Sequence, residues 1–258
     1  MPVLATRVGN VYDHVSYLAY CAETGEAAAI DPFHIELMLE TARAHGLAIT
    51  AIVNTHEHWD HAGRNDRIRG ETGAKVFAAK AAAGVIETVD TMLNEGDTVT
   101  IGKTCALKVL ATPGHTMTHI SLLGEEEGAP FLLCGDTLFG AGVGNCGFGG
   151  HAPTLYETVQ RLRAQLDPRT ILYPGHDYLA RNLAFTLHYE PDNAPAAALL
   201  EQVQEKSRFT SIAEEMQVNL FFRLEIDTVR RELTFDAGSS ADSDRDVFLA
   251  LRAARDNW

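Results

Sequence analysis

The sequence predicts an α+β protein, in which a mixed α and β domain is followed by a helical C-terminal part. Short apolar runs bounded by turn residues recur as far as residues 171–172, as in a chain rich in strands. These strand signals fade after His176, where Ala, Leu, Glu and Gln dominate. The 258 residues, 46% of them hydrophobic, suffice for one large domain or for a medium domain with an appendage.

Hydrophobic periodicity places the elements along the first two thirds of the chain. Residues 15–20 and 27–30 are predicted to form a hairpin that turns around Gly25. A helix is predicted over residues 35–45, where apolar side chains recur with helical spacing. Further strands are predicted at 49–53, 76–79, 99–101, 106–111, 120–123 and 131–133, and a helix at 154–166. The glycine-rich stretch 140–150 is predicted as a loop.

Helices dominate the remainder of the chain. They are predicted at residues 178–189, 194–207, 210–216 and 246–256. The run Glu190-Pro191-Asp192-Asn193 separates the first two of them, because proline cannot continue a helix. Neither an internal repeat nor a low-complexity linker is evident in the sequence.

Composition limits the classes of partner and compartment. The formal net charge of −14 argues against nucleic acid as a partner. Since the four cysteines are scattered without a C-x-x-C pair, neither a zinc ribbon nor a redox motif is expected. The N-terminus lacks the features of a secretory signal, and no apolar run approaches the roughly 18–20 residues of a membrane span. The expected protein is therefore cytoplasmic, has reduced thiols and does not bind a membrane.

Residues 55–61, Thr-His-Glu-His-Trp-Asp-His, carry the strongest functional signal. They place three histidines and an aspartate within six residues, directly after the apolar run 49–53. Imidazole and carboxylate together suit transition-metal ions. His56 and His58 project to the same side of an extended segment, because side chains alternate there. Asp60 and His61 follow where the chain turns into a helix. This pattern indicates a metal site.

Three later segments repeat the same arrangement. Each has a short apolar run, then a turn, then a potential ligand: Thr112-Pro113-Gly114-His115, Cys134-Gly135-Asp136 and Tyr173-Pro174-Gly175-His176. A glycine before the ligand lets the backbone turn tightly at the end of a strand. Four strand-end segments of this kind predict one shared cluster.

With these motifs the sequence resembles the metallo-β-lactamase superfamily and, within it, glyoxalase II, the hydroxyacylglutathione hydrolases. The resemblance covers nearly the whole chain. It implies a four-layer αββα sandwich over residues 1–177 that carries catalysis, and a helical substrate-binding domain over residues 178–258. It also implies two metal ions, the first held by His56, His58 and His115, the second by Asp60, His61 and His176, with Asp136 bridging both.

The implied chemistry needs such a set of ligands. Two divalent transition ions can share a hydroxide and leave open positions for substrate. Zinc is expected, and iron or manganese would also suit these ligands. Asp60 and Asp136 are the expected catalytic carboxylates: Asp136 sets the spacing of the ions, and Asp60 orients the bridging hydroxide as well as coordinating. That hydroxide would attack the thioester carbonyl, and thiolate would leave.

The resemblance also implies residues that bind glutathione. Arg252 and Arg255 lie three apart on one face of a predicted helix, and guanidinium pairs well with carboxylate. Tyr178 matches a tyrosine that contacts the thiol part of glutathione. Asn145 stands where the family has a cation and Gly147 where it has an aromatic residue, so this wall of the site departs from the family pattern. Asn145 is the substrate-binding residue expected on this wall.

The function implied is hydrolysis of a small-molecule thioester, S-D-lactoylglutathione, to glutathione and D-lactate. Two alternatives stay open. One is a persulfide dioxygenase-like oxidoreductase with a single iron, a class without the helical domain and its basic pair. The other is a metallo-hydrolase for another thioester or a lactone. The oligomeric state is left open by the sequence.

Overall fold

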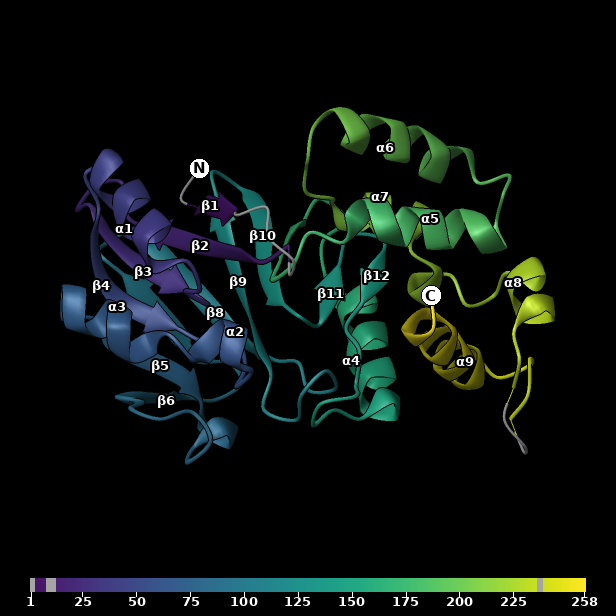
Figure 1. The fold of residues 1–258 in the computed structure, drawn as a ribbon, viewed down its shortest axis with the longest axis horizontal. Helices are drawn as coiled ribbons and strands as arrows, with labels where there is room; N and C mark the ends of the chain where they lie inside the picture. The colour runs from purple at the N-terminus through teal and green to yellow at the C-terminus, as the bar shows by residue number, and fades with distance from the viewer. Residues whose placement is uncertain (1–2, 8–12, 236–238) are drawn as a thin grey trace.

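Two β-sheets face each other at the centre of the computed structural model, which describes residues 3–7, 13–235 and 239–258. Helices cover the outer face of each sheet, so that the layers follow the order helix, sheet, sheet, helix (Figure 1). Further helices from the C-terminal part of the chain extend the last layer. This is the predicted αββα sandwich with a helical C-terminal region.

The first sheet has six strands in sequence order. They are β1 (Val3–Arg7), β2 (Val15–Tyr20), β3 (Glu26–Ile30), β4 (Ala48–Val53), β5 (Lys75–Ala79) and β6 (Thr91–Leu93). Strands β1 to β3 pair antiparallel, whereas β3 to β6 pair in parallel. Parallel neighbours need crossover connections. These contain helices α1 (Ile35–Ala44), α2 (Trp59–Ala62) and α3 (Asn65–Thr72) and the short 3₁₀ helix η1 (Lys80–Ala82).

The second sheet has five strands in the order β13-β10-β9-β8-β7. They are β7 (Thr98–Ile101), β8 (Cys105–Ala111), β9 (Ile120–Glu126), β10 (Ala129–Gly135) and β13 (Ile171–Pro174). A separate ribbon pairs β11 (Leu138–Phe139) with β12 (Gly142–Val143), and helix α4 (Ala152–Gln165) leads into β13. Strands β7 to β10 are antiparallel, and β13 runs parallel to β10.

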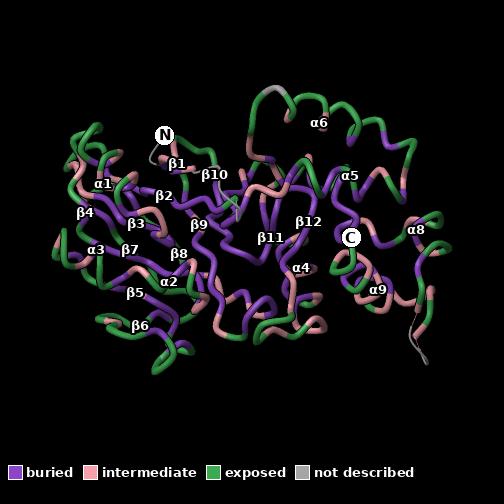
Figure 2. The backbone as a smooth tube through the Cα atoms, in the orientation of Figure 1, coloured by how far each residue is buried: buried purple, intermediate pink, exposed green. Residues whose placement is uncertain are grey.

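Buried residues follow the strands of both sheets (purple in Figure 2). Their side chains form a core between each pair of layers. Tyr17 and Val53 of the first sheet share one core with Leu107 and Leu133 of the second. Met38 of α1 packs in another core on the outer face of the first sheet. Because strand side chains alternate in direction, each sheet can supply two cores at once.

The C-terminal helices share a core with the second sheet. Their bounds are α5 (Leu179–Tyr189), α6 (Ala194–Glu205), α7 (Ile212–Val218), η2 (Leu220–Phe222), α8 (Asp227–Glu232) and α9 (Asp244–Asp256). Phe185, Phe221 and Phe248 are almost wholly buried and belong to one cluster with Leu172 of β13 and Val159 of α4. Burial of such aromatic side chains fixes these helices against the sandwich.

The predicted elements agree with this structure to within a few residues, with named exceptions. Strands β9 and β10 are longer than predicted, and the loop predicted at 140–150 contains β12. Among the described residues, seven elements had no prediction: β1, β6, β11, η1, α3, η2 and α8. All are short, and their apolar residues are too few to show a period. In the part of the chain that the structure describes, none of the helices combines the length and apolar character needed to cross a bilayer.

Glu215 of α7 ties the C-terminal helices to the β11–β12 turn. Its side chain is fully buried, and both carboxylate oxygens lie 3.0 Å from the backbone N–H of Ala141. The amide of Asn219 donates to the same carboxylate at 2.7 Å. Burial raises the pKa of Glu215 from its ordinary value of 4.5 to about 7, although the N–H donors of Ala141 and Asn219 oppose the rise.

This carboxyl should make unfolding free energy depend on pH. Because its pKa is higher in the folded state, the folded protein binds the proton more tightly between pH 4.5 and 7, and stability falls as pH rises through that window. The loss amounts to at most about 3 kcal/mol. In Glu215→Gln the unfolding free energy should fall less than in the parent over this range. Urea unfolding from pH 4.5 to 8 measures the difference, with exposed Glu201→Gln as the control; parallel curves for parent and Glu215→Gln would contradict it.

Candidate metal centre

The ligand segments predicted from the sequence meet at one edge of the two sheets. In the first sheet, the chain leaves β4 into residues 54–58, beside the end of the parallel strand β3. In the second sheet, β8, β10 and β13 all run in the same direction, because β8 and β10 are both antiparallel to β9. His115, Asp136 and His176 therefore emerge together, as expected for the carboxyl ends of parallel strands.

Backbone hydrogen bonds join the sheets at this edge. Val15 N–H donates to the carbonyl of Gly175 at 2.8 Å, and Ile120 N–H donates to the carbonyl of Thr55 at 2.8 Å. The ligand segments of both sheets are thus held by main-chain contacts, which side-chain substitutions in the cluster leave in place.

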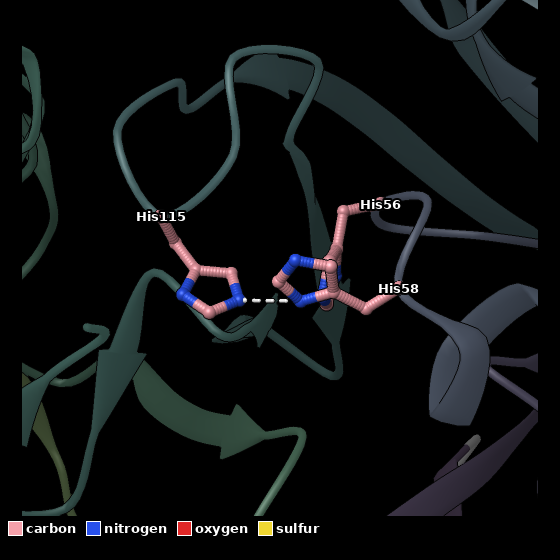
Figure 3. A group of neighbouring side chains, drawn as sticks. All are labelled: His56, His58 and His115. Atoms are coloured by element: carbon pink, nitrogen blue, oxygen red, sulfur yellow. Dashed lines mark hydrogen bonds between the residues drawn. The ribbon is translucent and has the colours of Figure 1, made fainter. Parts of the chain in front are cut away.

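His56, His58 and His115 form the first group of potential ligands. One ring nitrogen from each lies within 4.8 Å of the other two. The rings come from two segments on opposite sheets and point toward one another (Figure 3). His115 Nε2 lies 3.0 Å from His58 Nδ1. His56 and His115 are buried, and His58 is half-buried.

Asp60, His61, Asp136 and His176 form the second group. His61 Nε2 lies 3.4 Å from Asp136 Oδ1 and 3.8 Å from Asp60 Oδ2. His176 Nε2 lies 3.4 Å from both Asp60 Oδ2 and Asp136 Oδ2. Asp136 also reaches the first group, since its Oδ2 is 3.5 Å from His115 Nε2. The structure therefore brings together all seven residues that the sequence indicated, with Asp136 between the two groups.

Hydrogen bonds to the protein fix the tautomer of four of these rings. His58 Nε2 donates to the carbonyl of Phe148 at 2.9 Å, and His115 Nδ1 donates to the carbonyl of Asn145 at 2.7 Å. Each ring then presents a lone pair on its other nitrogen, His58 Nδ1 and His115 Nε2. These are the two nitrogens that lie 3.0 Å apart. They can share a hydrogen bond only if one ring is protonated, whereas a cation satisfies both.

Asp31 orients the other two rings. Its Oδ2 accepts from His61 Nδ1 at 2.9 Å and from the hydroxyl of Thr55 at 2.6 Å. That hydroxyl oxygen in turn accepts from His56 Nδ1 at 3.0 Å. Within the described residues, His56 Nε2, His61 Nε2 and Asp136 Oδ1 are buried and lack a hydrogen bond of good geometry, although His61 Nε2 and Asp136 Oδ1 lie 3.4 Å apart. Such unpaired buried groups each cost about 1–3 kcal/mol, so the donor set fits divalent cations.

Electrostatics distinguish the two groups. Burial lowers the pKa of His56 and of His115. Burial also opposes protonation of His61, but the carboxylates of Asp136 and Asp31 outweigh it and raise its pKa to about 10. The pKa of His176 is raised to about 12 in the same way by Asp136 and Asp60. The second group therefore favours positive charge, which a metal ion supplies in place of protons.

Two glycines leave the space that the cluster needs. A Cβ on Gly175 would lie 2.4 Å from Asp136 Oδ1 and 2.7 Å from His61 Cε1. Gly135 has a φ of +47°, and a Cβ there would lie 2.5 Å from the hydroxyl oxygen of Thr55. Position 175 therefore requires glycine because neighbouring side chains leave no room for a Cβ. Position 135 requires it for the same reason and because its backbone has a positive φ.

The cysteines near the cluster are poor nucleophiles. Cys134 is fully buried, and its thiol donates to the carbonyl of Leu138 at 3.2 Å. Burial raises its pKa above the usual range, and burial raises that of Cys146 to about 11. Since the thiolate is the reactive form, neither side chain is suited to covalent catalysis.

A cavity of about 420 Å³ lies against the cluster. Its walls include His58, Asp60, His115, Asp136 and His176. A second cavity of about 240 Å³ shares Phe139, Asn145 and Tyr178 with the first. A substrate can thus reach the cluster with one end and occupy the second cavity with the other.

All four residues expected to bind substrate line the second cavity, and they differ in their hydrogen-bond and packing partners: Asn145, Tyr178, Arg252 and Arg255. Tyr178 stacks on His176, with ring centroids 5.2 Å apart, and its side chain separates the cluster from the arginines. The side chain of Asn145 accepts from Gly147 N–H at 3.1 Å. Arg255 donates twice to Asn182 Oδ1 at 3.0 Å.

Arg252 lies in the last two turns of α9 and is almost wholly buried. Only 5% of its surface is exposed. Its Nη1 donates to the carbonyls of Val143 at 2.8 Å and Gly144 at 3.2 Å, and its Nη2 donates to Asp256 at 2.8 Å. Arg252 therefore ties α9 to the loop after β12 as well as lining the cavity.

Sequence reasoning missed three residues at this site. Asp31 follows the apolar strand β3, which is the same signal that revealed the other strand-end ligands. Arg181 lines the second cavity and lies three residues after Tyr178 on helix α5, a spacing that could have indicated it. His14 is buried beside His61 and His176, but it precedes a strand instead of following one. Nothing in the local pattern marks it.

Comparisons with known proteins agree with this geometry. The family model described as "Metallo-beta-lactamase superfamily" matches residues 22–176, and the model described as "Hydroxyacylglutathione hydrolase C-terminus" matches residues 177–258. The crystal structure of ETHE1 from Myxococcus xanthus is 25% identical with a TM-score of 0.69, and the alignment covers 97% of this chain and 90% of that one.

Two curated relatives are similar over nearly their whole length. Hydroxyacylglutathione hydrolase from Polaromonas sp. is 46% identical over 97% of both chains. The protein of the same name from Nitrosococcus oceani is 45% identical over 96% of this chain and 97% of its own. The resemblance noted in the sequence is confirmed. The chain belongs to the metallo-β-lactamase superfamily and, within it, to the hydroxyacylglutathione hydrolase family, glyoxalase II.

Proposed function

We propose that this protein hydrolyses S-D-lactoylglutathione to glutathione and D-lactate with two divalent metal ions. The observation that carries the proposal is the pairing of two cavities. One adjoins the His/Asp cluster, and the other is lined by three guanidinium groups, those of Arg181, Arg252 and Arg255, and by one carboxylate, Asp256. This excess of positive charge suits the carboxylates of a glutathione moiety. The relatives that share the family carry the name of this activity.

The superfamily implies a dinuclear site, and the donor set described above fits one. We propose that His56, His58 and His115 hold one ion, that Asp60, His61 and His176 hold the other, and that Asp136 contacts both. When bound, two such ions would lower the pKa of a water molecule and polarise the thioester carbonyl. Zinc is the proposed metal, and iron or manganese suits the same ligands.

The side chains of the chain itself position the reactants. Tyr178 lies between the cluster and the arginines, where the sulfur of a glutathione thioester would pass. Asp60 is half-buried, and its Oδ2 faces His176 and His61, so it can accept a proton from water at the cluster. Water adds its oxygen to the carbonyl carbon and gives one proton to Asp60. The C–S bond breaks with its electron pair on sulfur, and the thiolate takes up the proton from Asp60 and departs through the second cavity.

We propose that the two parts of the chain have different roles, the first in metal binding and the second in substrate binding. Residues 1–177 supply the seven ligands, and residues 178–258 supply Tyr178 and the arginines. The helical region with its basic residues favours the hydrolase over the persulfide dioxygenase alternative. Thiol release from S-D-lactoylglutathione, measured against thioesters of other thiols and against lactones, tests the proposal. Equal rates across the panel, or oxygen uptake with glutathione persulfide, would count against it.

Loss of Asp136 should remove both metal retention and activity. Its carboxylate lies between the two groups, within 3.5 Å of His61, His115 and His176. In Asp136→Ala, metal content should fall below the parent's expected two ions per chain, and kcat/KM should fall at least about a hundredfold. Elemental analysis and steady-state kinetics measure the two effects. A fully active enzyme with one ion per chain would refute the dinuclear proposal.

Cysteine substitution should leave hydrolysis intact. The thiols of Cys134 and Cys146 have raised pKa values and do not line either cavity. Cys134→Ser and Cys146→Ser should each retain kcat within about threefold of the parent, since neither thiol is proposed to react. Abolished turnover in a folded variant that retains its metals would point instead to a covalent thiol mechanism.

Substitution of Arg252 and of Arg255 in α9 by alanine should have different effects on substrate binding and stability. Arg255→Ala should raise KM for S-D-lactoylglutathione with kcat nearly unchanged, the pattern of lost uniform binding. A charged hydrogen bond of about 1.5–3 kcal/mol corresponds to a rise of about 10- to 150-fold. Arg252→Ala should also lower the melting temperature, because it leaves the carbonyls of Val143 and Gly144 without their donor. The exposed Arg231→Ala of α8 serves as the control. An unchanged KM in Arg255→Ala would show that this cavity does not bind the glutathione moiety.

A further inference from the structure

His14 lies at the start of β2, directly against the second group of ligands. Its side chain is 1% exposed. Its ring centroid is 4.9 Å from that of His61 and 5.1 Å from that of His176. A backbone bridge pairs residue 14 with residue 176, so the two sheets hold His14 in place. Phe33 packs against the same ring, with the ring centroids 5.0 Å apart.

The hydrogen bonds of Ser16 determine which nitrogen of His14 carries the proton. The hydroxyl of Ser16 donates to the carbonyl of Asp31 at 2.6 Å and accepts from Phe33 N–H at 3.2 Å. With its proton used in this way, the Ser16 oxygen can only accept from His14 Nδ1, 3.4 Å away. His14 therefore presents a lone pair on Nε2.

That Nε2 is buried and has no hydrogen-bond partner in the part of the chain that the structure describes. A ring nitrogen of His14 lies within 4.8 Å of ligand atoms of both Asp60 and His61. His56 and His61 show the same combination of a nitrogen fixed by the protein and a second one left as a buried lone pair. In both respects His14 resembles His56 and His61.

We propose that His14 is an additional metal ligand, through Nε2, for the ion held by Asp60, His61 and His176. This inference rests on the dinuclear site of the proposed function but not on its substrate. The ion would then have three imidazoles and the carboxylates of Asp60 and Asp136, whereas the ion of the first group has three imidazoles and Asp136.

Metal binding by His14→Phe tests this directly, with Phe33→Leu as a matched control that alters packing on the same ring. Chelator competition on the metal-loaded full chain should show one ion bound at least about tenfold more weakly in His14→Phe, with the other unchanged. The cobalt-substituted protein should change its visible spectrum, because one nitrogen ligand is lost. Phe33→Leu should keep both affinities within about threefold of the parent.

Unchanged affinities and an unchanged cobalt spectrum in His14→Phe would overturn the proposal and make His14 a packing residue. If that variant does not fold, His14→Gln decides, since its amide oxygen is a weaker ligand: an altered cobalt spectrum supports the proposal, and a parental one overturns it. Failure of the proposed function would look different. The parent would then bind two ions, and lose one of them more readily in His14→Phe, while leaving S-D-lactoylglutathione intact.

Discussion

The fixed tautomers of the clustered histidines are the constraint on which the site depends. His56, His58, His61 and His115 each spend one nitrogen on a protein acceptor, so each presents a lone pair to the same small volume. Asp31 supports this arrangement, because its carboxylate accepts hydrogen bonds from both His61 and Thr55. The hydrogen bonds thus orient each ring as a metal ligand would have to be oriented. They leave buried polar atoms that a bound cation would pair.

The sandwich makes this convergence possible. Ligands from the first sheet leave after β4, and ligands from the second leave after β8, β10 and β13, all at one edge. The large shared cores on both sides of the second sheet hold that edge rigid. Gly135 and Gly175 remove the side chains that would otherwise fill the space between the ligands. A scaffold of this kind can place reactive groups closely without strain in the ligands themselves.

The C-terminal helices add charge as well as cover. They share a core with the second sheet, and Glu215 and Arg252 reach across to the β11–β12 ribbon and the loop after it. Arg252 has the double role of structural donor and cavity wall, which separates it from the more accessible Arg255 and Arg181. Where the family pattern has a cation, this chain has Asn145, and Arg181 lines the same cavity. The positive charge that is absent at Asn145 is thus present in the same cavity at Arg181.

The sequence by itself determined most of the strands and helices, the helical character of the last third and the seven clustered candidate ligands. It could do so because these features are local: apolar periods, turn glycines and histidines at strand ends are visible within a few residues. The short elements β1, β6 and α8 escaped, because too few residues carry the pattern. Only the tertiary structure decided the burial of Arg252 and the places of Arg181, Asp31 and His14. Their surroundings are built from segments far apart in the chain, and the hydrogen bonds that fix a ring nitrogen depend on those segments meeting.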